Sequence, residues 1–307
     1  MSALVNDPAW HAARSRVVGG SEIAALFGCQ QPYQMALYEL WHVKAGLVSP
    51  PEVEGERIEW GNDLEDAIAH VAARRHGWEI KRGGHIPDPE CPGLGCTRDY
   101  WIKSGAEFPG LGVLEIKNVD WLQHRSKWTD GEPPAHILLQ LQVQLACTGC
   151  EWGYVGALIG GNKLEIYPFV ARPKIIAEIR KRVAAFWHSI EVGAVPQIDG
   201  SDGAFRTLRE LHPAPVDEEI DLSADEEFAV ACAELATATE QRKAAEKIEA
   251  AARARIIQAL GDHKRGAAAG WRASLSVTPA KPDREALPGE IIKGRAETRR
   301  LTVKEWT

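Results

Sequence analysis

The sequence predicts an α/β fold with a mixed central sheet flanked by helices, followed by an extension of different character. Helical and strand periodicities succeed one another through residues 1–212. Their order is helix, strand, strand, helix, strand rather than a repeated βαβ unit, which favours a mixed sheet in a three-layer core. Pro213 and Pro215 then mark a linker. We therefore expect two domains, residues 1–212 and residues 213–307.

Helices are expected where apolar residues recur every three or four positions and a glycine or proline marks an end. In the first domain these segments are 22–27 (capped by Ser21), 32–46, 59–76, 135–148 and 173–192. Strands are expected where apolar and polar residues alternate, or where a short apolar run lies between turn residues. These segments are 94–103, 111–118, 152–159 and 164–170.

The extension combines an acidic start with a basic remainder. Residues 217–227 hold seven acids and no base, whereas residues 228–307 hold fifteen bases and ten acids. A capping box at 223–226 begins an Ala-rich helix, or a helical hairpin, that ends near Leu260. Alternation over 271–277, with a mate near 301–303, predicts a β-hairpin. The apolar stripe of the helix is thin, so we expect this extension to serve oligomerisation or partner docking.

Bulk composition is that of an ordinary globular protein: 307 residues, 45% hydrophobic and 26% charged. The net charge of −7 excludes a general electrostatic attraction to nucleic acid, so any DNA binding must rely on a local basic groove or on cations. No apolar run approaches about 20 residues, and the N-terminus lacks the pattern of a signal peptide. We therefore expect a cytoplasmic protein with no membrane association and with its six cysteines as thiols. A four-thiolate metal site remains a minor alternative.

Residues 113–118, Val-Leu-Glu-Ile-Lys-Asn, are the segment that points to chemistry. Alternation places Glu115 and Lys117 on one face of a strand and Leu114 and Ile116 on the other. A carboxylate beside an ammonium on a half-buried strand can hold a metal ion next to a reactive water. Taken alone, the same pair is also typical of a surface cross-strand ion pair.

Acids and amides elsewhere complete a candidate site for phosphodiester hydrolysis. Asp99 lies on the preceding strand, Glu65 lies beside the buried face of the 59–76 helix, and Gln140 lies on the polar side of the 135–148 helix. Mg²⁺, with Mn²⁺ as a substitute, takes a few carboxylates and keeps several waters. The predicted metal ligands are Asp99 and Glu115, with the Ile116 carbonyl and Glu65 as further candidates. Lys117 would orient or deprotonate the water, and Gln140 would fix either partner.

The N-terminal segment Gly19-Gly20-Ser21-Glu22 offers a second kind of site. A flexible glycine pair followed by a helix start can present backbone N–H groups to an anion.

These blocks, in order, resemble the YqaJ-type viral recombinases, the phage lambda exonuclease group of the PD-(D/E)XK nucleases. The resemblance spans roughly residues 8–195 and implies a restriction-endonuclease-like core. It rests on Trp10-His11 with Arg14, Gly20-Ser21-Glu22, Trp60-Gly61 with Glu65, Asp99, Leu114-Glu115-Ile116-Lys117 and Gln140-Leu141-Gln142.

The resemblance implies roles for particular residues. Asp99, Glu115 and Lys117 would form the catalytic core, with Glu65 assisting the metal and Gln140 supporting the lysine. Arg14 and Ser21 would hold a 5′-terminal phosphate, together with a further arginine that is best matched by Arg125. In place of the usual Ser-Pro-Asp, this chain has Thr97-Arg98-Asp99.

The resemblance also implies an activity. Relatives are 5′→3′ exonucleases that act on double-stranded DNA ends and leave 3′ single strands for a single-strand annealing protein in phage-type recombination. They form homo-oligomeric rings, for which a trimer or tetramer is expected here, and work in the cytoplasm of a bacterial host from a phage or prophage gene. The sequence leaves two other classes open: an endonuclease or nickase of the same fold, and a non-catalytic DNA-end-binding module.

Overall fold

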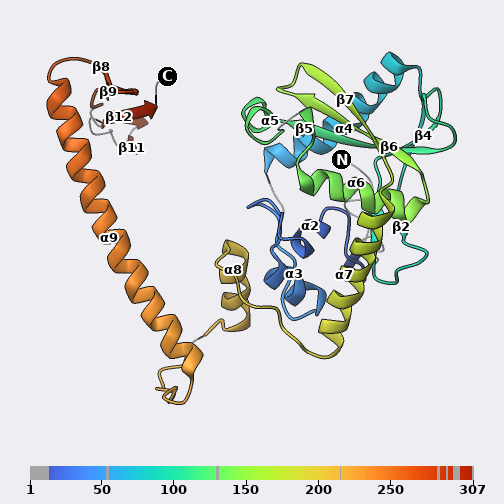
Figure 1. Ribbon diagram of the computed structural model, residues 1–307, viewed down its shortest axis with the longest axis horizontal. Coiled ribbons are helices and arrows are strands. Elements are labelled where there is room, and N and C mark those ends of the chain that lie inside the picture. The colour runs from blue at the N-terminus through green and yellow to red at the C-terminus, as the bar shows by residue number, and fades with distance from the viewer. Residues whose placement is uncertain are drawn as a thin grey trace. The chain divides into compact units, whose positions relative to one another are not determined.

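The computed structural model describes residues 14–52, 55–128, 131–214 and 216–281, together with the backbone of three short C-terminal strands at 284–287, 290–292 and 298–305. The chain separates into two compact units, Met1–Pro215 and Val216–Thr307 (Figure 1). In the described residues, no helix combines the length and the apolar character needed to cross a membrane.

A five-stranded mixed sheet forms the centre of the first unit, in the order β1-β4-β5-β6-β7. Its strands are β1 (Glu79–Arg82), β4 (Tyr100–Ser104), β5 (Gly112–Val119), β6 (Trp152–Ile159) and β7 (Lys163–Val170). Only β5 and β6 run parallel, and the other neighbours are antiparallel. A parallel pair needs a long crossover, which here contains two helices. The predicted mixed sheet is confirmed.

Helices cover both faces of this sheet (Figure 1). Helix α4 (Glu56–His76) packs Ile68 and Ala72 against Leu114 and Ile116 of β5. Helix α6 (Ala135–Thr148) packs on the opposite face, where Leu141 meets Val113. Because side chains alternate along a strand, Glu115 and Lys117 must point toward α6.

A third apolar cluster joins α6 to the N-terminal elements. It includes side chains from α2 (Ile23–Leu26), α3 (Leu37–Lys44) and α7 (Pro173–Glu191). The short strands β2 (His85–Pro87) and β3 (Gly95–Thr97) pair beside it, and Val18 forms a parallel bridge with Leu94. This bridge ties the N-terminal segment to the start of β3, and Val18 and Leu94 pack in one cluster with Leu139 and Val143 of α6, the helix that faces Glu115.

Several elements differ from the sequence prediction. The expected strand at 94–103 is two strands, β3 and β4, in different sheets. The chain leaves regular pairing at Arg98 and Asp99, which directs Asp99 toward β5 instead of into a ladder. Helix α5 (Trp121–Lys127) and helix α8 (Asp202–Leu211) were not predicted, because neither buries a large apolar side chain that would give its sequence a helical period. Ser21 does not cap α2, whose N-cap residue is Glu22.

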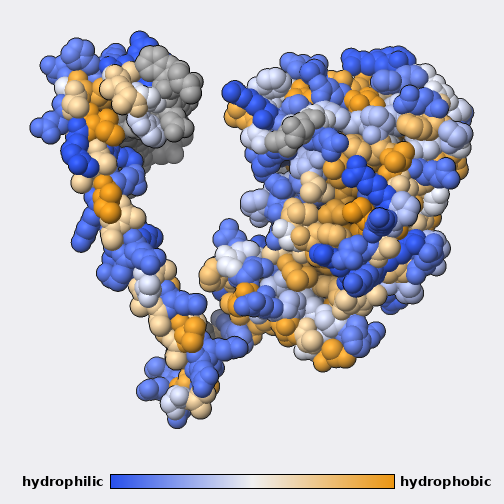
Figure 2. Space-filling model, viewed as in Figure 1, coloured by the Kyte–Doolittle hydropathy of each residue, from blue (hydrophilic) through white to orange (hydrophobic). Residues whose placement is uncertain are grey.

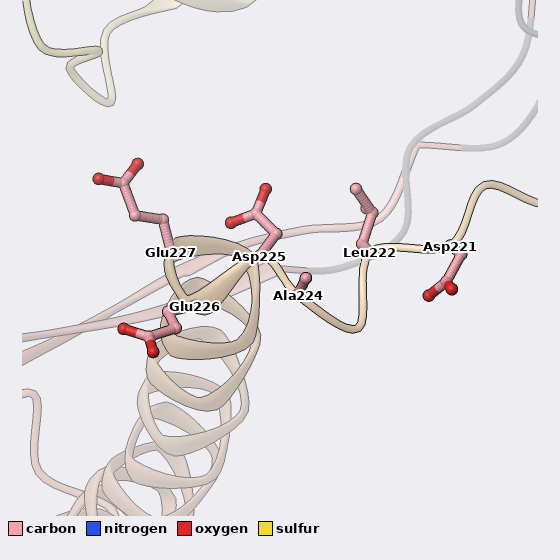
Figure 3. Close-up of a pocket in the computed structure, with 6 residues that line it drawn as sticks. All are labelled: Asp221, Leu222, Ala224, Asp225, Glu226 and Glu227. Atoms are coloured by element: carbon pink, nitrogen blue, oxygen red, sulfur yellow. The ribbon is translucent and has the colours of Figure 1, made fainter.

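The second unit consists of one long helix and small sheets. Helix α9 (Glu226–Leu260) is a single helix of 35 residues, and the alternative of a helical hairpin is wrong. Its N-cap is Asp225 (Figure 3), whose carboxylate accepts a hydrogen bond from the Phe228 N–H at 2.9 Å.

The expected β-hairpin is larger than predicted. Strands β8 (Arg265–Ala268), β9 (Trp271–Thr278) and β12 (Thr298–Glu305) form a three-stranded sheet in the order β12-β9-β8. Strands β10 (Arg284–Leu287) and β11 (Glu290–Ile292) form a separate antiparallel pair. The predicted mate at 301–303 does pair with β9.

The start of β5 has no room for a side chain, and this predicts a stability effect. A Cβ at Gly112 would overlap the indole ring of Trp152 on β6. We expect Gly112→Ala to lower the free energy of unfolding by about 2 kcal/mol or more, as overpacked cores do. The matched control is Gly61→Ala inside α4, where a Cβ meets open space and alanine should stabilise the helix by about 0.5–1 kcal/mol. Urea denaturation of both variants measures the difference, and equal stabilities would contradict the packing described.

Candidate active site

Glu115 is the centre of the candidate site, and it is almost completely buried, with 1% of its surface exposed. Its Oε1 accepts hydrogen bonds from Lys117 Nζ and from Gln140 Nε2, both at 2.6 Å. Its Oε2 accepts one from Gln144 Nε2 at 2.5 Å. A buried carboxylate is tolerated only when it is paired and hydrogen-bonded, and these three donors satisfy that condition.

Lys117 completes a closed triangle with its neighbours, since its Nζ also donates to Gln140 Oε1 at 3.1 Å. Desolvation alone would lower the pKa of this ammonium, but the carboxylates of Glu115 and Asp99 outweigh it and raise the pKa. Lys117 is therefore a cation at neutral pH. The predicted contact between Gln140 and the lysine is present.

Asp99 reaches the site from the break between β3 and β4. Its Oδ2 accepts a hydrogen bond from the Ile116 N–H at 2.7 Å. The N–H and C=O of a strand residue point toward the same neighbouring strand, so the Ile116 carbonyl lies on the Asp99 side. Desolvation raises the pKa of Asp99 well above its ordinary value, and the negative charges of Glu115 and Glu65 raise it further.

Glu65 approaches from α4, where Arg82 Nη2 lies 3.1 Å from its Oε1. Burial raises the pKa of Glu65; the Arg82 guanidinium opposes this shift, whereas Glu115 and Asp66 add to it. Three acids, from α4, β5 and the break before β4, therefore repel one another across the site. The structure brings together the predicted set of Asp99, Glu115, Lys117, Glu65 and Gln140.

The donor chemistry of this point suits a hard divalent cation, because such an ion relieves the mutual repulsion that raises the pKa of Asp99. Within the described ranges, however, no three His, Cys, Asp or Glu side chains are arranged closely enough to hold a metal. Both oxygens of Glu115 instead accept hydrogen bonds from Lys117 and the two glutamines. The residues fit the ion in chemistry, and Glu115 must exchange partners to bind it.

Gln144 is a site residue to which the sequence prediction gave no role. It is fully buried, and its Nε2 donates to the Thr97 carbonyl at 3.3 Å as well as to Glu115. These two acceptors fix the orientation of the amide, which leaves Oε1 without a hydrogen-bond partner among the described residues. The sequence feature that could have identified it is its spacing, because Gln140 and Gln144 are one helical turn apart and share a face of the helix.

The N-terminal segment lies against the same helix. Glu22 accepts hydrogen bonds from the Gly19 N–H at 2.7 Å and from Lys44 Nζ at 3.0 Å, and Arg14 Nη2 lies 3.9 Å from its carboxylate. A Cβ on Gly20 would lie only 3.2 Å from Gln140 Cγ, so glycine permits this close approach. The segment that carries Arg14 and the exposed Ser21 is thus fixed beside Gln140.

The third residue predicted to bind the 5′-phosphate lies on a different element. Arg125 is exposed on α5, the helix that follows β5, whereas Arg14 and Ser21 belong to the N-terminal segment. The Trp10-His11 part of the resemblance lies outside the described residues.

Known structures share this fold. An alkaline exonuclease (LHK-Exo) from Laribacter hongkongensis is 23% identical, with a TM-score of 0.51, and the match covers 61% of this chain and 94% of that chain. The structure of LHK-Exo in complex with dAMP gives 24% identity with the same TM-score and coverage. These likenesses confirm the restriction-endonuclease-like core. Among curated proteins, none matches the chain.

A family comparison identifies the domain that contains the site. Residues 9–151 match the family described as the YqaJ-like viral recombinase domain. The matched range includes Glu65, Asp99, Glu115, Lys117 and Gln140. The candidate site therefore lies within the part of the chain that is similar to this family.

Proposed function

We propose that this protein is a metal-dependent exonuclease that degrades one strand of double-stranded DNA from its 5′ end. The observation that carries the proposal is the gathering of Asp99, Glu65 and Glu115 around Lys117 inside a YqaJ-like domain. Three acids in mutual repulsion, one of them buried and two half-buried, destabilise a fold, and perturbed pKa values of this kind mark functional sites.

Lys117 contributes as a charged donor in this proposal. Its ammonium lies 2.6 Å from Glu115 and 3.1 Å from Gln140, so its position is set by two elements, β5 and α6. A fixed cation stabilises the negative charge that develops on the phosphoryl oxygens and orients the attacking water. Gln140 holds both partners, and Gln144 fixes the far oxygen of Glu115.

We propose that Asp99, Glu115, the Ile116 carbonyl and Glu65 hold Mg²⁺, with Mn²⁺ as a substitute. A bound divalent ion neutralises phosphoryl charge and lowers the pKa of water. The Asp99 carboxylate is oriented for this role by the Ile116 N–H, which holds one of its oxygens.

The direction of digestion depends on which end is recognised. We propose that Arg14 and Ser21 hold the 5′-terminal phosphate, with support from Gly20, whose contact with Gln140 fixes the segment beside the acids. Arg125 would contact the same strand from α5 rather than share this subsite. A local basic site is required because the chain as a whole has a net charge of −7.

We further propose that the product is a 3′ single strand that passes to a single-strand annealing protein during phage-type recombination. The YqaJ-like domain supports this role, as it supports a ring of three or four copies and action in the cytoplasm of a bacterial host. The proposed division of labour assigns nuclease activity to residues 1–212 and assembly or docking to residues 213–307.

The decisive test compares linear and closed circular duplex DNA. With Mg²⁺ we expect degradation of linear DNA that has free 5′ ends, protection when both 5′ ends are blocked, and no cutting of closed circles. Lys117→Ala should slow digestion about 100- to 1000-fold while end binding persists, because it removes charge stabilisation rather than contacts to the duplex. Nicking of circles would favour the endonuclease alternative. Binding without any digestion by the wild type would favour the non-catalytic module.

Gln144 provides a sharper test of the geometry. Gln144→Leu leaves one oxygen of buried Glu115 without a donor, so we expect a loss of activity of about 10- to 100-fold per folded molecule. The control is Gln142→Leu on the same helix. Gln142 is also buried, but it bonds the Val170 carbonyl and the Arg172 N–H, away from Glu115. Both variants should lose stability, and only Gln144→Leu should lose specific activity. Equal activities would remove Gln144 from the site.

In this proposal Arg14 determines the preference for 5′-phosphorylated DNA ends and takes no part in phosphodiester hydrolysis. We expect Arg14→Ala to reduce the preference for 5′-phosphorylated over 5′-hydroxyl ends about tenfold, because one charged hydrogen bond to phosphate is lost. Initial rates on the two substrates measure the ratio. Arg125→Ala, with its side chain on a separate element, is the comparison. An unchanged preference in Arg14→Ala would exclude Arg14 from end recognition.

A further inference from the structure

Helix α9 is long, and its own unit covers little of it. Of its 35 residues only Leu260 is buried, and Ala252, Ile256 and Ile257 near its end are half-buried. Phe228 is 49% and Leu235 is 70% exposed. Figure 2 shows apolar patches interspersed with polar ones along the exposed helix. At 1.5 Å per residue the helix is about 52 Å long. Helices in proteins gain most of their stability by packing an apolar face against another element. We therefore expect a partner to cover the exposed apolar residues of α9.

Large and small residues alternate along one seam of α9 with a seven-residue period. Alanine recurs at 231, 238, 245, 252 and 259. Three residues before each alanine stand Phe228, Leu235, Arg242, Glu249 and Ile256. The two series therefore occupy the a and d positions of a heptad repeat, which is the pattern of a two-stranded coiled coil.

One antiparallel register makes the two series complementary in size. If Phe228 of one copy lies opposite Ala259 of another, then Leu235 meets Ala252 and Ile256 meets Ala231. Every large seam residue then faces an alanine, which lets the two backbones approach closely. Arg242 and Glu249 place charges at two of the five large positions, so the seam favours a reversible pair over a permanent one.

The charges of α9 agree with this orientation. Residues 226–240 hold four acids and no base, whereas residues 241–260 hold five bases and two acids. Antiparallel pairing sets the acidic half of each copy against the basic half of the other, and parallel pairing would place like charges together. The same charge distribution also suits the dipole of an isolated helix. Antiparallel pairing is therefore supported by the match of large and small residues in this register and not by charge alone.

One ion pair between the two helices is specific to this register. Glu234 of each copy lies beside Arg255 of the other, so the pair occurs twice in the symmetric dimer. Within one helix these residues are 21 positions and about 30 Å apart, too far to touch. The ion pairs within residues 226–260 join Arg242 to Glu246, Lys243 to Glu240 and Arg253 to Glu249, and neither Glu234 nor Arg255 takes part in them.

We propose that α9 docks against α9 of a second copy of this chain as an antiparallel two-stranded coiled coil, with its two-fold axis near residues 243–244. In this pairing the acids at the start of α9 face the basic half of the other copy. They do not form a cation site. Figure 3 shows the carboxylates of Asp221, Asp225, Glu226 and Glu227 pointing away from one another. This two-fold contact joins copies in pairs, so it is separate from the contact that would close a ring of three or four copies, and the proposal is independent of the nuclease activity.

Charge reversal in the full-length protein tests the proposal by sedimentation equilibrium. Glu234→Arg and Arg255→Glu should each weaken self-association through α9 about tenfold, because each sets like charges together twice. The double variant should return to within about threefold of the wild type. A wild type that stays monomeric, single reversals without effect, or a double variant no stronger than the singles would each overturn the proposal.

The second test shortens an apolar side chain of the seam and measures self-association. Leu235→Ala removes a seam side chain from both copies and should weaken association on the order of a hundredfold. Val230→Ala is the matched control, because Val230 is also exposed, at 56%, but lies on the side of α9 away from the seam. Circular dichroism checks that helix content is retained. Equal weakening by both variants would overturn the assigned face.

Discussion

The first unit depends on the burial of one charged side chain, Glu115. Water no longer solvates its carboxylate, so the protein must supply every hydrogen bond that water gave up. It does so from two elements: β5 provides Lys117, and α6 provides Gln140 and Gln144. The helix and the strand are thereby held in one relative position. The apolar contact of Leu141 with Val113 lies on the same interface, so packing and polar contacts agree.

The sequence was sufficient for the parts of the structure that follow from periodicity. Alternation along 113–118 placed Glu115 and Lys117 on one face, and helical spacing located α4, α6 and α9. The residues that converge from distant positions were anticipated through the family resemblance, since no local pattern brings Glu65 of α4 near Asp99. Their catalytic roles remain proposals, as do the metal and the polarity of digestion.

The misses have local physical causes. A strand expected over 94–103 breaks at Arg98, because the chain passes from the β2–β3 pair to the central sheet there. Helix α5 buries none of its seven residues, so its sequence has no apolar face to recognise. It begins at Asp120, whose carboxylate accepts hydrogen bonds from two backbone N–H groups. Gln144 was not given a role because an amide on a helix is usually solvated. Only the fold reveals that this turn of α6 faces a buried carboxylate.

The alternation along β5 also constrains how this sequence can change in length. A single residue inserted or lost between Gly112 and Lys117 would exchange the two faces of the strand, carrying Glu115 into the apolar layer beneath α4 and Leu114 toward the glutamines. An insertion or deletion of two residues would keep each side chain on its original face of the strand. It would still move the Glu115 carboxylate along the strand by two residues. The turn between Ser104 and Gly112 lies outside the paired strands, but it is also fixed, because Phe108 stacks on Trp152 and the Pro109 carbonyl accepts a hydrogen bond from the Trp152 indole. Natural variation in length should therefore be absent from β5 and rare in the turn that precedes it.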